Sequence, residues 1–199
     1  DGELLSIDTL TGDATAIGPS VSSILALALD GTILYAGGHF TEIDGDGDFH
    51  HLVAFDMTAP GGTLVETFLP DITGGAVRAL LLDGSTLYVG GSFTTVNGAN
   101  ADHQSIVAVN AATGTVVNAF LASTTGDVFS LLRNGTTLYA GGSFTEANGD
   151  TDYPYFAAFN TLDGSLRSGF QPSVSGTVYA LIQHGTVIYA GGYFTAIEG

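Results

Sequence analysis

The sequence predicts an all-β protein, a β-propeller of four blades with four antiparallel strands each. The main observation is a segment of about ten residues that recurs four times along the 199-residue chain, centred on Tyr-x-Gly-Gly-x-Phe-Thr. Self-similarity with a period of about fifty residues indicates a repeat architecture in which neighbouring units bury a common core. The four copies are TILYAGGHFT, STLYVGGSFT, TTLYAGGSFT and TVIYAGGYFT.

A tight turn precedes each copy, and an apolar stretch precedes each turn. A glycine that follows Asp or Asn between two apolar runs predicts a β-hairpin with a type I′ turn. Glycine inside a strand marks a bulge or a close approach by another backbone, so we expect Gly37-Gly38 and its equivalents to lie against a neighbour. The Phe that follows is expected to pack between blades. The turns are Asp30-Gly31, Asp83-Gly84, Asn134-Gly135 and His184-Gly185, and the phenylalanines are Phe40, Phe93, Phe144 and Phe194.

A second hairpin follows in each repeat, with strands LVAFD, IVAVN and FAAFN, and its fourth copy stands at the start, Leu4 to Asp8. The chain therefore begins with a second hairpin and ends with a first one. We expect the N-terminal strands to complete the C-terminal blade and close the ring, as propellers commonly do. The alternatives are an open arc from a larger propeller, or terminal half-blades that pair between molecules.

These boundaries give a single domain over residues 1–199. Its repeat units are approximately 21–70, 71–121, 122–172 and 173–199, the last completed by 1–20. The sequence begins with Asp1 and shows no charged-then-apolar leader, so we expect a processed chain or an excised segment.

Charge and composition exclude several classes of function. Twenty acidic residues stand against three arginines and no lysine, a net charge of −17, which argues against nucleic-acid binding. The longest apolar run, Ile24 to Leu29, is far too short to span a bilayer, which takes about 20 residues. Without cysteine there is neither a thiol nucleophile nor a disulfide. Absence of Lys with abundant Thr and Gly predicts an extracellular or cell-surface protein.

The loops after each Phe-Thr are the longest and most polar segments, and the first of them carries the candidate metal ligands. Asp44, Asp46 and Asp48 alternate with glycine, as oxygen ligands do in calcium-binding loops, which makes them candidate calcium ligands. A solvated acidic turn is nevertheless the favoured interpretation, because the Glu that ends such loops is missing. Asn134 begins an N-glycosylation sequon. A transition-metal site at His50 and His51, with His39 and Asp48 near, is a further alternative. The predicted ligand-face residues are His39, Tyr153, Tyr155 and Tyr193.

The repeat as a whole resembles the delta-sixty-type repeats of large bacterial surface proteins, which are related to kelch-like propellers. The resemblance rests on the Asp-Gly turn, Leu-Tyr-x-Gly-Gly-x-Phe-Thr, the Asn-Gly loop and the x-Thr-Gly turn, and it covers essentially the whole chain. It implies a noncatalytic surface propeller and supplies no catalytic residues.

Three classes of function remain open. The leading hypothesis is a noncatalytic extracellular module for adhesion or self-assembly, with a filament or surface-layer subunit as a variant, whose partners are further copies or surface glycans. The second is a calcium-dependent, lectin-like glycan-binding propeller. The third is a polysaccharide hydrolase or lyase. The sequence contains no Gly-x-Ser-x-Gly elbow or other nucleophile motif that would support it.

Overall fold

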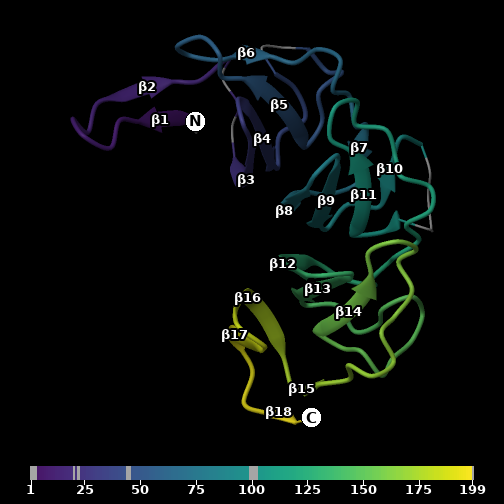
Figure 1. The fold of residues 1–199 in the computed structure, drawn as a ribbon. Coiled ribbons are helices and arrows are strands. Elements are labelled where there is room, and N and C mark those ends of the chain that lie inside the picture. The colour runs from purple at the N-terminus through teal and green to yellow at the C-terminus, as the bar shows by residue number, and fades with distance from the viewer. Residues whose placement is uncertain (1–3, 20, 22, 44–45, 99–102, 199) are drawn as a thin grey trace.

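The chain forms an open arc of antiparallel β-sheets with almost no helix (Figure 1). The structure is a computed structural model that describes residues 4–19, 21, 23–43, 46–98 and 103–198. Among these residues there is no helix long and apolar enough to cross a membrane. All the named elements of the described residues are strands, so the all-β prediction is confirmed.

Unit 1 contains the most complete sheet, and unit 2 lacks a fourth strand. Unit 1 has four strands in the order β3-β4-β5-β6, and unit 2 has three in the order β11-β9-β8, with a single bridge from Val109 to Val116 in place of a fourth. The unit 1 strands are β3 (Ile24–Asp30), β4 (Ile33–Gly38), β5 (Leu52–Asp56) and β6 (Thr63–Leu64). The unit 2 strands are β8 (Val77–Asp83), β9 (Thr86–Gly91) and β11 (Ile106–Asn110).

Unit 3 repeats the pattern of unit 2, and unit 4 has only its first hairpin. In unit 3 the fourth strand is again one bridge, between Phe159 and Leu166. The unit 3 strands are β12 (Val128–Asn134), β13 (Thr137–Gly142) and β14 (Phe156–Asn160), and those of unit 4 are β16 (Thr177–His184) and β17 (Val187–Tyr193). Two short ladders pair β7 (Ile72–Thr73) with β10 (Thr95–Val96) and β15 (Ser173–Val174) with β18 (Ile197–Glu198).

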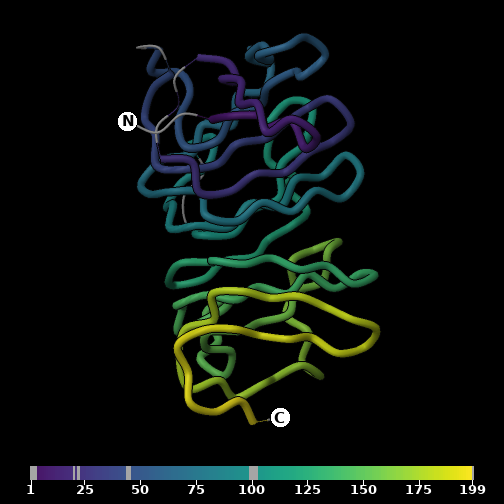
Figure 2. Tube along the Cα trace, turned by 90° about the vertical axis from the view of Figure 1, so that its left-hand side faces the viewer, coloured from purple at the N-terminus to yellow at the C-terminus, as the bar shows by residue number. Residues whose placement is uncertain are grey.

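The units lie side by side along the arc. Their inner strands β3, β8, β12 and β16 are neighbours in that order. Figure 2 shows the result from the open side, with the strands stacked one above another from the N-terminus to the C-terminus. Each hydrophobic cluster joins two neighbours, since Tyr35 and Phe68 of unit 1 share a cluster with Phe93 of unit 2, and Tyr88 of unit 2 shares one with Phe144 of unit 3.

The first hairpins form as predicted, but their turn type differs from the prediction. The last strand residue, Asp30 in unit 1, is not at positive φ, whereas the glycine after it is. A type I′ turn needs positive φ at both central residues, and a type II′ turn needs it only at the first, where glycine stands. The positive-φ glycines are Gly31 (56°), Gly84 (56°), Gly135 (58°) and Gly185 (61°).

The paired glycines allow the close approach that was predicted. A Cβ on Gly37 would lie less than 3.0 Å from the side chain of Val77 in the next unit. A Cβ on Gly38 would lie equally close to the carbonyl oxygen of Ser23, at the start of its own inner strand. The first glycine therefore admits the neighbouring unit, and the second admits the partner strand.

Ring closure by the N-terminal strands is not observed. The hairpin of β1 (Leu5–Ile7) and β2 (Ala14–Ala16) forms a two-stranded sheet of its own, and β16 and β17 form another. The hairpin is instead held at unit 1, where the Gly18 amide donates a 2.5 Å hydrogen bond to Gly61 and Leu4 is buried in the cluster of Phe55. Because β1 is anchored there, it lies at the opposite end of the arc from β17 (Figure 1).

Candidate functional site

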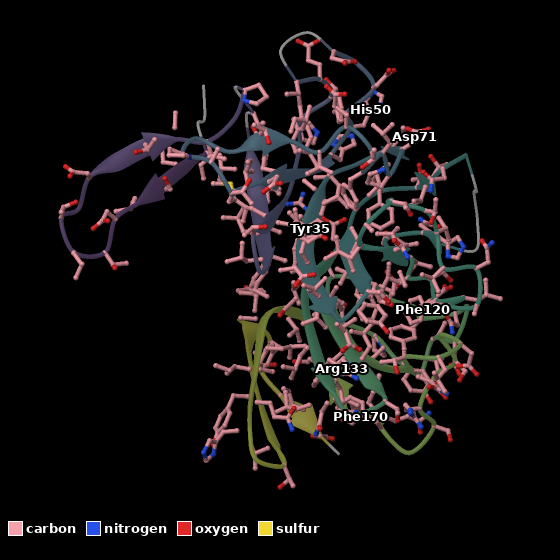
Figure 3. The ribbon with its side chains drawn as sticks, turned by 45° about the horizontal axis from the view of Figure 1, so that its top comes forward. Tyr35, His50, Asp71, Phe120, Arg133 and Phe170 are labelled. Atoms are coloured by element: carbon pink, nitrogen blue, oxygen red, sulfur yellow. The ribbon has the colours of Figure 1, made fainter. Side chains whose placement is uncertain are left out.

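The packing around the motif tyrosine is repeated with little change along the arc, first within each unit and then between units. In each of units 1 to 3 the motif tyrosine packs edge-on against the phenylalanine that ends the second hairpin, with ring centroids 5.1–5.4 Å apart. The pairs are Tyr35–Phe68, Tyr88–Phe120 and Tyr139–Phe170. Figure 3 labels Tyr35, Phe120 and Phe170 along the arc.

The tyrosine hydroxyl connects one unit to the next. Tyr35 donates a 2.8 Å hydrogen bond to the carbonyl of Ala111, and Tyr88 donates a 3.3 Å one to the carbonyl of Thr161. Both acceptors directly follow the third strand of the next unit. Burial, with a smaller effect of Asp30, raises the pKa of the Tyr35 phenol, so the group stays protonated as a donor.

A second column of contacts runs along the inner strands. The guanidinium of Arg78 in unit 2 lies 5.5 Å from the ring centre of Phe129 in unit 3, and that ring lies 5.2 Å from Tyr179 in unit 4. Arg78 also pairs with Asp127 at 3.1 Å, and Arg133 pairs with Asp83 at 2.8 Å. Arg78 and Arg133 therefore serve contacts between units, whereas Arg167 donates to Thr136 within unit 3.

The exposed large apolar side chains gather where this repeated contact stops. Of the fifteen in the described part of the chain, twelve belong to the two ends of the arc. The N-terminal end surface consists of Leu5, Ile7, Leu10, Leu25, Leu27 and Leu29. The C-terminal end surface consists of Tyr179, Ile182, Val187, Tyr189, Tyr193 and Ile197.

The exposure at the C-terminal end contrasts with the same positions inside the arc. Tyr189 is 57% exposed, whereas its equivalents Tyr35 and Tyr88 are 2% and 3% exposed. A Cβ on Gly191 would meet nothing within 4 Å, whereas one on its equivalent Gly37 would meet Val77. Unit 4 thus presents a surface that in the other units is covered.

The N-terminal hairpin has the internal structure of a complete second hairpin. The Asp8 carboxylate accepts hydrogen bonds of 2.8 and 2.9 Å from the amides of Leu10 and Thr11, and these bonds lower its pKa. The Asn110 side chain caps the turn of unit 2 in the same way. The Gly12 amide donates to the Asp8 carbonyl at 2.8 Å, as that of Gly114 does to Asn110. This half of a unit is therefore folded without its first hairpin.

The predicted calcium loop is described only in part. Asp44 lies outside the described residues, and Asp46 and Asp48 are exposed. The Asp46 carboxylate accepts a 3.0 Å hydrogen bond from the Asp48 amide, which is a turn contact. Asp150 makes the same contact to Asp152 in unit 3. No group of three or more potential metal ligands occurs where the chain is described, and calcium stays a prediction.

The histidines of unit 1 form a small cluster at the outer edge. The rings of His39 and His51 lie 5.8 Å apart, and His50 Nδ1 lies 3.6 Å from Asp71 (Figure 3). His51 is 5% exposed and has a φ of 60°, at the position where Ser105 and Tyr155 also have positive φ. Burial lowers its pKa, and the nearby His39 and His50 add to the shift.

Two of the three predicted ligand-face tyrosines lie together, and the third is buried. Tyr153 is 3% exposed and fills the core between units 2 and 3, whereas Tyr193 is 83% exposed on the C-terminal end surface. Tyr155 and Tyr193 line a cavity of about 450 Å³ with Phe194. His39 is exposed at the opposite end of the chain, and Asn134 is exposed at a turn where a glycan would be accessible.

A larger cavity of about 530 Å³ lies between units 1 and 2, around Asp30, Tyr35 and Phe68 on one side and Asn110 on the other. Tyr35 and Ala111, which are joined by a hydrogen bond, both line it, and its lining is mainly apolar.

Neither cavity tests the glycan-binding or the enzymatic alternative, and both stay predictions.

Sequence reasoning missed the two end surfaces and the tyrosine hydroxyl bonds. The signal for the end surfaces was present in the unmatched half-units at the two ends. The partner of Tyr35 lies 76 positions away, so no local pattern marks it.

Comparison with solved structures shows the fold alone. The chain is similar to the crystal structure of the computationally designed Ika4 protein, with a TM-score of 0.57, 16% identity, and coverage of 100% of this chain and 96% of that chain. It is also similar to that of the computationally designed Ika8 protein, with a TM-score of 0.51, 15% identity, and coverage of 91% of this chain and 59% of that chain. No protein-family model and no curated protein sequence matches.

Proposed function

We propose that this protein is a noncatalytic, extracellular or cell-surface module of the β-propeller type that acts by self-assembly. The observation that carries the proposal is the concentration of exposed apolar side chains on the two end surfaces. Exposed apolar side chains gathered at the ends of an otherwise well-packed protein are typical of an interaction site. The four repeats, arranged as neighbours along an arc, support the propeller type.

Composition supports the proposed location. The chain has no lysine, no cysteine and a net charge of −17, with 29 glycines. A strongly acidic surface keeps copies apart except where apolar surface favours contact. Assembly is thereby directed to the two end surfaces, and binding of surface glycans would use the polar loops that remain free.

The test is the mass of the full chain in solution. Sedimentation velocity and light scattering over a wide concentration range should show masses that are multiples of 20.2 kDa. Electron microscopy of the same samples should show rings or filaments. A protein that stays monomeric at every concentration would overturn the proposal.

A further inference from the structure

We propose that copies of this chain join head to tail, with β1 of one copy added to the open edge of β17 in another. The proposal rests on the self-assembly proposed above and specifies its interface. In this arrangement Leu4 lies opposite Gly191, Ser6 opposite Tyr189, and Asp8 opposite Val187. The joined strands complete unit 4 of one copy with the N-terminal hairpin of the other.

The register comes from the three units whose second and third strands are paired. In unit 1 Gly37 lies opposite Leu52, Tyr35 opposite Ala54, and Ile33 opposite Asp56. Units 2 and 3 have the same register, with Tyr88 opposite Ala108 and Tyr139 opposite Ala158. Because Ser6 is the equivalent of these alanines and Tyr189 of these tyrosines, the pairing follows directly. A one-residue slip would exchange the buried and exposed faces of β1.

The N-terminal hairpin already holds the position of an outer half-unit. In unit 1 the third-strand residue Leu52 packs in one cluster with Phe93 of unit 2, and in unit 2 the equivalent Ile106 packs with Phe144 of unit 3. Leu4 is the equivalent residue of β1, and it packs in one cluster with Phe40 of unit 1. The hairpin is thus placed before unit 1 as β5 is placed before unit 2. What fits its inner edge is a first hairpin such as β16–β17.

A second copy supplies that hairpin. The chain's own β16–β17 packs on unit 3 at the far end of the arc, as Figures 1 and 2 show. Both elements therefore keep their present contacts when they come from different copies. Closure within one chain would require the arc to bend until β3 met β16, and these strands are not neighbours in the order of inner strands.

Two further contacts would be completed at the same interface. Gly37, Gly90 and Gly141 each lie against a valine at the start of the next inner strand. Gly191 has open space there, and the equivalent residue of the other copy is Ile24.

The tyrosine hydroxyls give the second contact. Tyr35 and Tyr88 donate to the carbonyl of the residue after the third strand of the next unit, Ala111 and Thr161. For Tyr139 the equivalent acceptor is Thr9 of the other copy. Within the described residues Tyr139 has its ring packed on Phe170, with no comparable acceptor in the next unit.

The interface can be trapped with an engineered disulfide. Because the chain has no cysteine of its own, the introduced cysteines can pair only with each other. In unit 1 the Met57 amide donates a hydrogen bond to the Thr32 carbonyl, and the Gly38 amide donates one to the His51 carbonyl. The pair of Tyr35 and Ala54 is therefore of the non-hydrogen-bonded type, whose Cα atoms lie about 4.5 Å apart, within the range a disulfide bridges. The equivalent pair is Ser6 and Tyr189, and both residues are exposed.

The experiment uses two single variants, Ser6→Cys and Tyr189→Cys, co-expressed with tags of different mass and oxidised gently. A disulfide-linked heterodimer is expected on non-reducing gels. The matched control replaces Ser6→Cys with Thr15→Cys, which lies opposite Ser6 on β2, one strand farther from the proposed edge, and should give no heterodimer. Far-ultraviolet circular dichroism checks that all variants fold.

The outcomes separate this proposal from the one above it. If the double variant Ser6→Cys/Tyr189→Cys gives only an intramolecular disulfide, closure occurs within one chain and head-to-tail joining is wrong. If no Ser6–Tyr189 link forms although light scattering shows multimers, assembly stands but uses another surface. If the protein is monomeric and unlinked, both proposals fail.

Joining head to tail uses unlike surfaces, so the contact is heterologous. Such contacts give closed rings when the rotation between copies closes, and filaments when it does not. Each joint should therefore be of the same type, and linking the double variant should give either one covalently closed species or a ladder of masses.

Discussion

The hydroxyl of Tyr35 donates a buried 2.8 Å hydrogen bond to the carbonyl oxygen of Ala111, across 76 positions of the chain. It ties the second strand of unit 1 to the end of the third strand of unit 2. The bond shows that the motif tyrosine fixes the spacing of neighbouring units as well as filling the core.

Replacing Tyr35→Phe should destabilise the protein by about 1–3 kcal/mol, because the buried carbonyl of Ala111 loses its donor. Urea unfolding of dilute protein measures the change. Tyr189 is 57% exposed, so the matched control Tyr189→Phe should have the same free energy of unfolding as the wild type. Equal losses in both variants would contradict a specific role for the hydrogen bond.

Replacing Gly37→Ala should cost about 1–3 kcal/mol in stability, because the new methyl group would overlap Val77 of unit 2. Gly191→Ala should leave the stability of the dilute chain unchanged, since its Cβ enters open space. At higher concentration the same substitution should weaken association, because Ile24 of another copy would occupy that space. Sedimentation equilibrium of Gly191→Ala beside the wild type checks this, and unchanged association would count against the proposed interface.

Stability should fall as the pH drops below the ordinary His pKa of 6.5, because of His51. Burial favours its neutral form and lowers its pKa in the folded protein, so at mildly acidic pH the unfolded state binds more protons. His51→Asn, which tolerates the positive φ of 60°, should reduce this dependence. Unfolding in urea at pH 7.5 and 5.5 provides the comparison. The variant His184→Asn keeps His51 and should keep the wild-type dependence.

Association should strengthen with added sodium chloride. Each copy carries a net charge of −17, so copies repel one another at low ionic strength. The Debye length falls from about 30 Å at 0.01 M to about 10 Å at 0.1 M, which screens this repulsion and leaves apolar burial intact. Light scattering across a salt series measures the effect. Assembly that needs calcium at constant ionic strength would instead point to the acidic loop, and dissociation by salt would contradict an apolar interface.

The hairpins and their strands were predictable because each depends on a local signal. The glycine after Asp30 marks the turn, and the apolar stretches on both sides mark the strands. The turn type was wrong because Asp30 itself closes the strand ladder opposite Ile33, so the two-residue loop starts one position later, at Gly31. The choice between the two turn types depends on strand register, which the dipeptide alone does not specify.

Whether the N-terminal hairpin pairs with the last hairpin of its own chain was not predictable from the repeat. The sequence specifies which strand Leu4 to Asp8 can pair with, but closure depends on the angle between neighbouring units. That angle follows from side-chain packing such as Val77 against Gly37, and a small change at each contact accumulates along the arc.

The structural role of the polar loops was also missed, because the backbone groups that their side chains contact are distant in the sequence. The Asn97 side chain joins the Asp71 amide and the Gly114 carbonyl, and Asp44 aligns with Asn97 in the repeat.

The two end surfaces differ in kind, since one carries only leucine and isoleucine side chains and the other carries three tyrosines. An arc with unlike ends has a direction, and copies joined through those ends all point the same way around the curve. Every copy would then present its Asp46–His50 loop on the same side of the assembly. An assembly of this protein would therefore repeat with a period of one molecule, and the Asp46–His50 loop would recur once in each period.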